Sequence, residues 1–283
     1  MYADDINLLH SGKNLCHIIN DVNSDLQCLF NWFSTNKLRV NHNKSNYIIF
    51  HSPQHKIPSK LPPPVLFDKN SLQHVNSCKF LGIILDEFLS WKAHINYTCR
   101  KITIGIHYLT KVRHFLPPHS LKTIYDTFIE SHIRYGIESW GSVCKTSLKP
   151  LLTLQKRAIR IMNFLPPWSS TLEIFATSGI LTICQLSYFH LAILMYKLFN
   201  GLIILDDIIL NHYSHNTACR SQSNNPLSTS KVNNNYGKQK INYIGCILWN
   251  KIDPTTRNLS ANNFKKEIKN HIVCNNSKLY TLL

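Results

Sequence analysis

Helical periodicity after Ser90 is the feature that most constrains how this chain can fold. Apolar residues recur there in steps of three and four, which places them on one face of an α-helix. The pair Pro117–Pro118 should end the first of these helices, and Ser120 should cap the next one. A third helix is expected from about 148 to 164, and two more between 168 and 200. The first stripe consists of Ile95, Cys99, Ile102, Ile106, Leu109 and Val112.

The first ninety residues mix one helix with short strands. An apolar stripe from Leu15 to Phe33 predicts an amphipathic helix that packs on a sheet and closes at Asn36–Lys37. Strands are expected at 6–9, directly after an acidic tip, and at 46–50. The expected fold class is α+β, with a small antiparallel sheet and its packed helix followed by a mostly helical region. Two further strands, 72–75 and 79–85, should form a hairpin joined through Asn76–Ser77.

Composition shifts divide the chain into four expected parts. They are a mixed segment over 1–90, a helical segment over 91–210, a polar linker over 211–240 and a tail over 241–283. The linker is rich in Asn and Ser and has too little apolar content to order itself. In the tail, Trp249 should be buried, and a short helix after Ser260 should turn Phe264, Ile268 and Ile272 inward.

The charge of the chain is strongly positive. It has 31 Lys and Arg against 15 Asp and Glu, a formal net charge of +16 and a sequence pI near 9.5. A field of this sign favours nucleic acid or an anionic membrane surface as the partner. Nine cysteines with no zinc-ligand spacing and no signal peptide point to a reducing compartment, the nucleus or the cytoplasm, and not to secretion.

The most apolar run, from Ile180 to Leu210, is interrupted by polar residues such as Gln185 and Asp206–Asp207. It is therefore interpreted as a buried core segment and not as a membrane span. His190 within it is interpreted as a packed core histidine, because no second metal ligand lies nearby in the sequence. The expected caps in this region are Ser169 or Ser170 for the first helix and Thr182 for the second, with Gly179 between the two helices.

The acidic tip at Asp4–Asp5 has two interpretations. Adjacent aspartates are common in solvated turns. They also provide the oxygen ligands that Mg²⁺ prefers, and pairs of such metals clamp the attacking and leaving oxygens in nucleotidyl transfer. The two carboxylates stand out because acidic residues are scarce in this chain.

Several motifs, taken in order, resemble the reverse transcriptase of non-LTR retrotransposons, and their spacing is similar to that of the jockey-like elements of animals. Each motif is weak alone, but the likeness extends over nearly the whole chain. The motifs are Tyr2-Ala3-Asp4-Asp5, Asn36-Lys37-Leu38 with Asn41 and Lys44, Phe80-Leu81-Gly82-Ile83 with Leu85-Asp86, Leu89, Trp91 and His94, Tyr135-Gly136 with Trp140-Gly141, Leu154-Gln155-Lys156-Arg157-Ala158, and Leu248-Trp249-Asn250-Lys251.

The resemblance implies a catalytic role for the acidic tip. Asp4 and Asp5 would be ligands of two catalytic Mg²⁺ ions, and Tyr2 would lie beside the primer terminus and the incoming nucleotide. Lys44 would protonate the leaving pyrophosphate as a general acid. A nucleoside triphosphate, an RNA template and a DNA primer would be the partners of the intact enzyme, with no membrane involved.

The resemblance also implies that the segment Phe80, Leu81 and Gly82 belongs to a hairpin that grips the primer, with Gly82 allowing close approach of the backbone. In this family a palm carries the metal site, and a helical thumb holds the template–primer duplex by its phosphates. The 1–90 segment would then be a partial palm, and 91–210 the thumb and connection.

Basic residues of the expected thumb helices are the candidates for phosphate binding. A solvated helix face is the alternative for any one of them, whereas the cluster as a whole favours binding to a nucleic-acid backbone. The candidates are Lys101, Lys111, Arg113, Lys156, Arg157 and Arg160.

One departure from the family concerns the metal site, which needs a further aspartate from an upstream motif and fingers residues for the nucleotide. The 283 residues begin at the acidic tip, so the two-metal site is incomplete and the chain alone is expected to be inactive. The alternative is a non-enzymatic remnant of a mobile element that retains only nucleic-acid binding.

Overall fold

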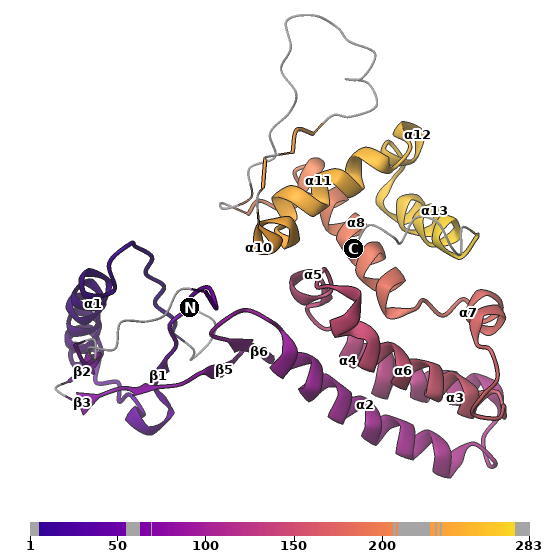
Figure 1. The fold of residues 1–283 in the computed structure, drawn as a ribbon, viewed down its shortest axis with the longest axis horizontal. Helices are drawn as coiled ribbons and strands as arrows, with labels where there is room; N and C mark the ends of the chain where they lie inside the picture. The colour runs from indigo at the N-terminus through magenta and orange to yellow at the C-terminus, as the bar shows by residue number, and fades with distance from the viewer. Residues whose placement is uncertain are drawn as a thin grey trace, which may run out of the picture. The chain divides into compact units, whose positions relative to one another are not determined.

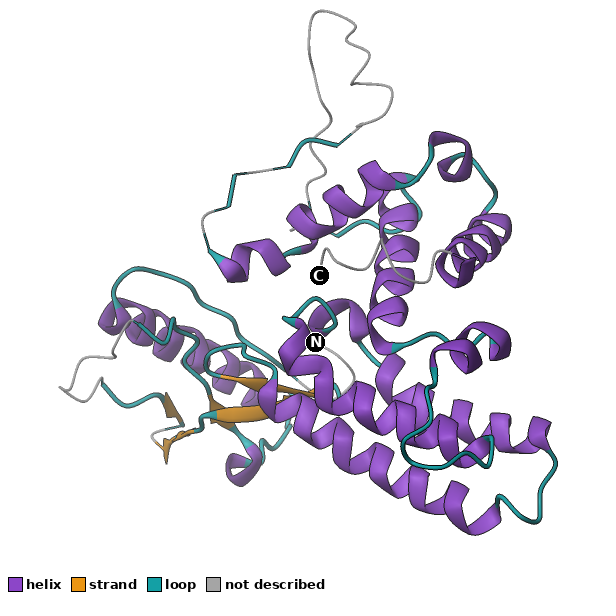
Figure 2. Ribbon diagram, turned by 45° about the vertical axis from the view of Figure 1, so that its right-hand side comes forward, coloured by secondary structure: helices purple, strands orange, loops and turns teal. Residues whose placement is uncertain are grey.

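The computed structural model describes residues 6–54, 63–68, 70–205, 208, 227–229, 231–232 and 234–274. The chain divides into two compact units, Met1–Ala93 and His94–Leu283. The first unit holds one long helix and short strands, and the second consists of helices (Figures 1 and 2). The predicted α+β class is therefore confirmed.

The first unit is built around helix α1, Leu15–Thr35, which ends at the C-cap Asn36 as the sequence predicts. Its N-cap is Asn14, whose side chain accepts a hydrogen bond from the backbone N–H of Cys16. A 3₁₀ turn and short strands follow: η1 His42–Lys44, β1 Asn46–Tyr47, β2 Leu66–Phe67, β3 Asn70–Ser71, β4 Gln73–His74, β5 Ser77–Phe80 and β6 Ile83–Asp86.

Helix α1 packs on strand β2 through aromatic contacts and one bridging amide. The rings of Phe30 and Phe33 lie 5.8 and 6.3 Å from that of Phe67. The Asn23 side chain accepts from the N–H of Leu66 and donates to the C=O of Pro64. The amide therefore satisfies backbone groups at the start of a strand that has few partners of its own.

The strands form three two-stranded sheets in the part of the chain that the structure describes. β1 pairs with β4 in parallel, while β2–β3 and β5–β6 are antiparallel. The expected single antiparallel sheet is therefore replaced by separate pairs. The expected strand over 6–9 is wrong, since the described residues there form no regular structure, and the one over 46–50 shrinks to two residues.

The hairpin predicted around Asn76–Ser77 is also misplaced. Strands β5 and β6 pair from Ser77 with Asp86 to Phe80 with Ile83, so the turn consists of Leu81 and Gly82. Both turn residues have positive φ, 44° and 83°, which is the requirement of a two-residue turn that matches strand twist. Glycine adopts this conformation at little cost, whereas Leu81 does not, and that is why the sequence pattern pointed elsewhere.

The second unit begins with α2, Lys92–Val112, followed by a helix that runs from Pro118 to Arg134 with a π-helical turn in its middle. Pro118 occupies the first helical position, so the N-cap is Pro117 and the predicted cap at Ser120 is wrong. The other bounds are α3 Pro118–Tyr125, η2 Asp126–Glu130, α4 Ser131–Arg134, α5 Ile137–Trp140, α6 Lys145–Met162, α7 Leu172–Ser178, α8 Ile183–Phe199, α10 Asn235–Gln239, α11 Ile241–Lys251, α12 Pro254–Arg257 and α13 Ala261–Cys274.

Helix α8 is the centre of this unit and packs against α4, α5, α6, α11 and α13 (Figure 1). It begins with the predicted Thr182 cap, which forms a reciprocal capping box with Gln185. Gly141 at the end of α5 has no room for a side chain, because a Cβ there would lie 2.5 Å from the hydroxyl of Ser187. That glycine lets α5 approach α8 closely.

The stretch Leu172–Phe199 is long and apolar enough to cross a membrane by length and composition alone. The structure divides it into two helices, separated by Gly179 with a φ of 63° and three further residues. More than half of its most apolar 18-residue window is buried within the protein. Together with the packing of α8, this burial confirms a core segment from Ile180 to Phe199. The predicted core does not continue beyond that helix in the described residues, because Leu202 and Ile204 are 63% and 84% exposed. The cap of α7 differs from both predicted serines, because Thr171 occupies that position.

The C-terminal helices bury aromatic residues against α8. Trp249 and Phe264 are fully buried, as predicted, and their rings lie 6.0 Å apart. The Tyr196 ring of α8 lies 4.5 Å from Phe264, and its hydroxyl donates to the C=O of Leu259. Most of the predicted polar linker lies outside the described residues, but Leu227 within it is buried, and its end forms α10.

Candidate nucleic-acid interface

The acidic tip itself, with Tyr2, Asp4 and Asp5, lies outside the described residues. Two adjacent carboxylates provide hard oxygen donors, so the donor set fits Mg²⁺. Among the residues that the structure describes, no group of three or more His, Cys, Asp or Glu is placed to hold a metal ion. The predicted metal ligands therefore stay a prediction.

Lys44 ends the 3₁₀ turn η1 and lies two residues before strand β1. Its side chain is exposed. The turn is fixed by Asn41, whose side chain accepts from the N–H of Asn43 and whose C=O accepts from the hydroxyl of Ser45. The lysine thus projects from an ordered loop, as the sequence predicted, and its catalytic role stays a prediction.

The segment Phe80, Leu81 and Gly82 forms the end of the β5–β6 hairpin. Phe80 is half-buried and Leu81 is 36% exposed. The sequence reasoning assigned Gly82 to close approach of a primer, but its φ of 83° shows that the turn alone requires a glycine. The primer-gripping role of this hairpin stays a prediction.

Asp86 organises the loop after this hairpin, a role that its place in the motif did not indicate. One carboxylate oxygen accepts from the N–H groups of Phe88 and Ser90 at 3.2 and 2.9 Å, and the other accepts from Trp91 at 2.9 Å. These bonds hold a loop in which Leu89 and Trp91 have positive φ. An aspartate at the end of a strand was the available signal, since its side chain competes well for backbone N–H groups.

The exposed face of α2 is basic and aromatic. Lys101 lies over the ring of Tyr97, with its Nζ 5.7 Å from the ring centroid, while Lys111 and Tyr108 are exposed. The opposite face is buried, with Ile102 and Leu109 fully inaccessible, while the outer end of Tyr108 contacts Phe128 edge-on. No acidic residue occurs between Glu87 and Asp126. Helix α2 itself therefore carries no acidic residue that could neutralise its positive charge.

Helix α6 has a second basic face. Its cationic residues are spaced by four, seven and four positions, so they form one stripe about 22 Å long at 1.5 Å per residue. The opposite face is buried and carries Leu151 and Ala158. No acidic residue lies between Glu138 and Glu173. The stripe consists of Lys145, Lys149, Lys156 and Arg160, with Arg157 exposed beside it.

The predicted phosphate-binding residues differ in how free their side chains are. Lys101, Lys111 and Arg157 are exposed and Lys156 is half-buried. The other two make contacts within the protein: Arg113 donates from Nε to Nε2 of His114 at 3.0 Å, and Arg160 donates from Nε to the C=O of Ser169 at 2.9 Å. Each guanidinium keeps further donors, because it has five N–H groups.

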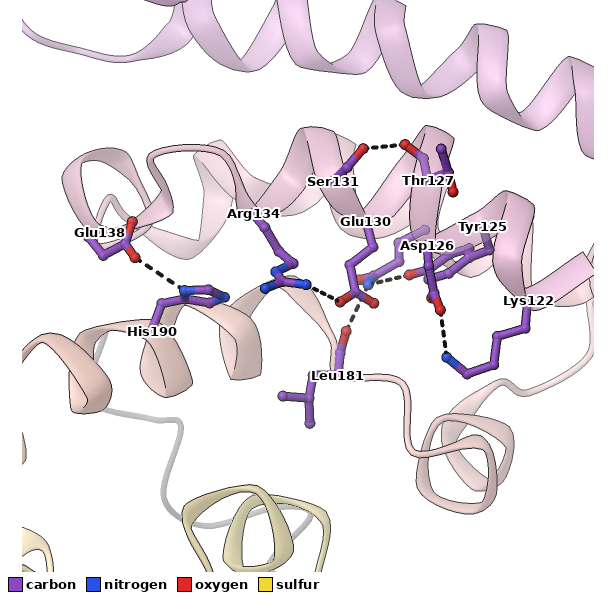
Figure 3. Close-up of polar contacts among 11 residues, drawn as sticks. Lys122, Tyr125, Asp126, Thr127, Glu130, Ser131, Arg134, Glu138, Leu181 and His190 are labelled. Atoms are coloured by element: carbon purple, nitrogen blue, oxygen red, sulfur yellow. Dashed lines mark hydrogen bonds and ion pairs between the residues drawn. The ribbon is translucent and has the colours of Figure 1, made fainter. Parts of the chain in front are cut away.

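Three acidic residues of this unit, Asp126, Glu130 and Glu138, lie around the π-helical turn and α5 (Figure 3). Asp126 pairs with Lys122 at 2.9 Å, Glu130 with Arg134 at 3.8 Å, and Glu138 with Nδ1 of His190 at 3.1 Å. His190 was predicted to be a packed core histidine; it is half-buried and has a hydrogen-bond partner, Glu138, that the sequence did not indicate.

The pKa values of two of these carboxyls move in opposite directions. Burial raises the pKa of Glu130, and the nearby charge of Asp126 adds to the increase. Burial also acts to raise the pKa of Glu138, but the hydrogen bond from His190 and a backbone hydrogen bond outweigh it, so its pKa lies below the usual value. The partners of these three acids, Lys122, Arg134 and His190, all lie outside α2 and α6.

Comparison with known proteins identifies the class of protein that the chain resembles. The chain is similar to RNA-directed DNA polymerases of non-LTR mobile elements, so the resemblance predicted from its motifs is confirmed. No protein-family model matches the sequence, and no solved structure gives a significant match.

The particular relatives come from fruit flies. A probable RNA-directed DNA polymerase from transposon X-element of Drosophila melanogaster is 26% identical over 167 residues, which are 57% of this chain and 18% of the relative. The polymerase from mobile element jockey of Drosophila funebris is 23% identical over 176 residues, 61% of this chain and 19% of the relative. The chain thus spans about a fifth of the length of the curated relatives it matches.

Proposed function

We propose that this chain is the part of an RNA-directed DNA polymerase that holds the RNA template and DNA primer, with the helical unit binding the duplex through its phosphates. The observation that carries the proposal is the pair of acid-free basic faces on α2 and α6. Cationic side chains at helical spacing neutralise successive phosphates, and this sequence-independent term dominates non-specific nucleic-acid binding. The similarity to polymerases of mobile elements supports the choice of an RNA–DNA duplex as the partner.

The metal and nucleotide site is proposed at the N-terminal end of the chain. Asp4 and Asp5 would hold Mg²⁺, which supplies electrostatic stabilisation of the charge that develops on the phosphoryl oxygens. Tyr2 would position the nucleotide and Lys44 would provide a proton to the leaving group. The donor chemistry of the two carboxylates and the order of the motifs support these roles.

The cysteine content supports a proposal about where the chain acts. The chain acts in the nucleus or the cytoplasm, where cysteines stay reduced, and its nine cysteines show no spacing of a disulfide framework.

The alternative function, a remnant of a mobile element that only binds nucleic acid, would use the same basic faces. Because the two-metal site is expected to be incomplete in these residues, neither alternative predicts primer extension by the chain alone, and nucleotide incorporation on a primed RNA template with Mg²⁺ and deoxynucleotides would contradict that expectation.

A pair of charge variants tests duplex binding directly. Lys149→Gln with Lys156→Gln removes two charges from the α6 stripe while keeping most of each side-chain stem. The matched control is Lys265→Gln with Lys266→Gln, which removes two exposed charges from α13, where Glu267 lies beside them. Fluorescence anisotropy with a labelled blunt RNA–DNA duplex at about 0.1 M KCl measures each affinity.

The α6 variant should bind the duplex at least about tenfold more weakly than wild type, with a salt slope reduced by about two. The α13 control should stay within about twofold of wild type, because a contact outside the interface releases no counterions. Equal weakening by both pairs would show that only net charge matters. An α6 variant with unchanged affinity would show that the duplex does not bind to this face.

A further inference from the structure

Exposed aromatic rings and basic side chains meet where the C-terminal ends of α2 and α6 come together. The guanidinium of Arg113, just past α2, lies 5.5 Å from the ring centroid of Phe164, just past α6. The ring of His114 lies 5.4 Å from the same phenylalanine and accepts a hydrogen bond from Arg113. Cation–π contact and this hydrogen bond fix the cluster in place.

Three aromatic side chains of this region are turned to solvent. Phe115 and Trp168 are each 84% exposed, and Phe164 is 54% exposed. The loop that carries Trp168 is tied to α6 by the bond from Arg160 to the C=O of Ser169. Phe115 and Trp168 follow the contacting pair Arg113 and Phe164 by two and four residues. Large exposed rings on an ordered surface are unfavourable in water and mark a binding site. We call Arg113, His114, Phe115, Phe164 and Trp168 the aromatic tip.

The charge around the aromatic tip selects an anionic partner. The acids nearest to it in sequence are Asp126 and Glu173, and Asp126 is already paired with Lys122. Lys111 and Arg160 extend the positive charge along the two helices. A partner that offers flat faces to aromatic rings and negative charge to cations is a single-stranded nucleic acid, whose bases stack while its phosphates are neutralised.

We propose that the aromatic tip stacks on unpaired bases of a single strand that continues beyond the duplex held by α6. The inference rests on the proposed function, because the α6 stripe ends at Arg160 and Phe164 lies one turn further on. A duplex that follows the stripe delivers its single-stranded extension to the tip. The tip then senses whether the template continues unpaired, with no need to recognise its sequence.

The test compares a blunt RNA–DNA duplex with one that has a six-nucleotide single-stranded extension, using the full chain and fluorescence anisotropy. Wild type should bind the extended duplex about 5- to 160-fold more tightly than the blunt one, the range expected for one stacked base. Phe115→Ala with Trp168→Ala should remove this gain and leave blunt binding unchanged. Trp168→Phe should keep it, because any aromatic face stacks.

Two controls separate this inference from the proposed function. Leu172→Ala removes an apolar side chain that is 67% exposed next to the same loop, and it should keep the gain because leucine has no stacking face. Lys149→Gln with Lys156→Gln should weaken blunt and extended duplexes equally and keep the gain. If that charge variant binds the blunt duplex like wild type while the extension still helps, duplex binding by α6 fails, whereas stacking of the aromatic tip on unpaired bases stands.

Three results would overturn the stacking proposal. They are the absence of a gain from the extension in wild type, a gain that survives removal of Phe115 and Trp168, and an equal loss on blunt and extended duplexes. A surface for a second copy of the chain would instead appear as self-association in sedimentation that the aromatic variant abolishes, with the gain unchanged. Both aromatic residues are highly exposed, so the variant should fold, and its thermal unfolding midpoint verifies this.

Discussion

Gln155 offers the sharpest test of how the helical unit is held together. Its side chain is fully buried and joins three segments. Its Nε2 donates to the hydroxyl of Tyr125 at 2.9 Å and to the C=O of Leu181 at 2.8 Å, while its Oε1 accepts from the N–H of Ile183 at 3.0 Å. Figure 3 shows Tyr125 and Leu181 facing each other across this network. The change Gln155→Leu keeps the volume and removes every one of these bonds.

The cost follows from the groups left behind. A hydroxyl, a carbonyl and a backbone N–H would stay buried without their partner, at about 1–3 kcal/mol each. Allowing for partial relaxation, we expect Gln155→Leu to lower the free energy of unfolding by about 3–5 kcal/mol. That is a large share of the roughly 5–15 kcal/mol that stabilises a typical domain. The unfolding midpoint should fall by about 10 °C for a unit of this size.

The assay is thermal and urea unfolding followed by circular dichroism, with Tyr125→Phe as the companion variant. Tyr125→Phe removes one partner and leaves the other two bonds of Gln155 in place, so it should cost only about 1 kcal/mol. The double variant should cost less than the two single changes together, because the Tyr125–Gln155 bond is counted twice. A Gln155→Leu protein within 1 kcal/mol of wild type would refute the reasoning.

Two further predictions concern other polar contacts. Asp86→Ala should speed hydrogen exchange of the three loop amides that its carboxylate binds by about 30-fold, equivalent to about 2 kcal/mol; unchanged exchange would contradict the assigned role. Glu138→Gln should be less stable than wild type at pH 7. Folding lowers the pKa of Glu138 below its usual value of 4.5. The ionised carboxylate therefore adds to the free energy of unfolding above pH 4.5, and this contribution is lost as the pH falls through the lowered pKa of the folded state. Urea midpoints should therefore converge in acid; a constant difference would refute the pair with His190.

Local signals in the sequence predicted the helices well. The stripe of α1 and its end at Asn36 depend on neighbours within a few residues, as does the box formed by Thr182 and Gln185. The buried faces of α11 and α13, with Trp249 and Phe264, follow from the same periodicity. Such features require only the chain's own spacing.

Pairing between distant segments could not be read in this way. The parallel contact of β1 with β4 joins residues 46–47 to 73–74, and two-residue strands leave almost no pattern to detect. Leu81 at a positive φ contradicts the usual preference for turn residues, so the hairpin was placed wrongly. The contact of Arg113 with Phe164 likewise joins the ends of two helices that are fifty residues apart.

Several residues of the motifs that carry the resemblance have structural roles. Asp86 holds a loop, Gly141 lets two helices approach, and Gln155 satisfies buried groups. The lysine and arginine next to Gln155 instead lie on or beside the outer face of α6. One short motif therefore combines a residue that fixes the fold with residues that we propose contact the nucleic acid.

The most direct test of the central claim is the salt dependence of wild-type binding to a blunt RNA–DNA duplex. If the four cations of the α6 stripe each neutralise one phosphate, the logarithm of the association constant should fall against the logarithm of KCl concentration with a slope of about −3 to −4. Further contacts by α2 would make the slope steeper. A slope near zero, or no measurable binding at 50 mM KCl, would contradict the account.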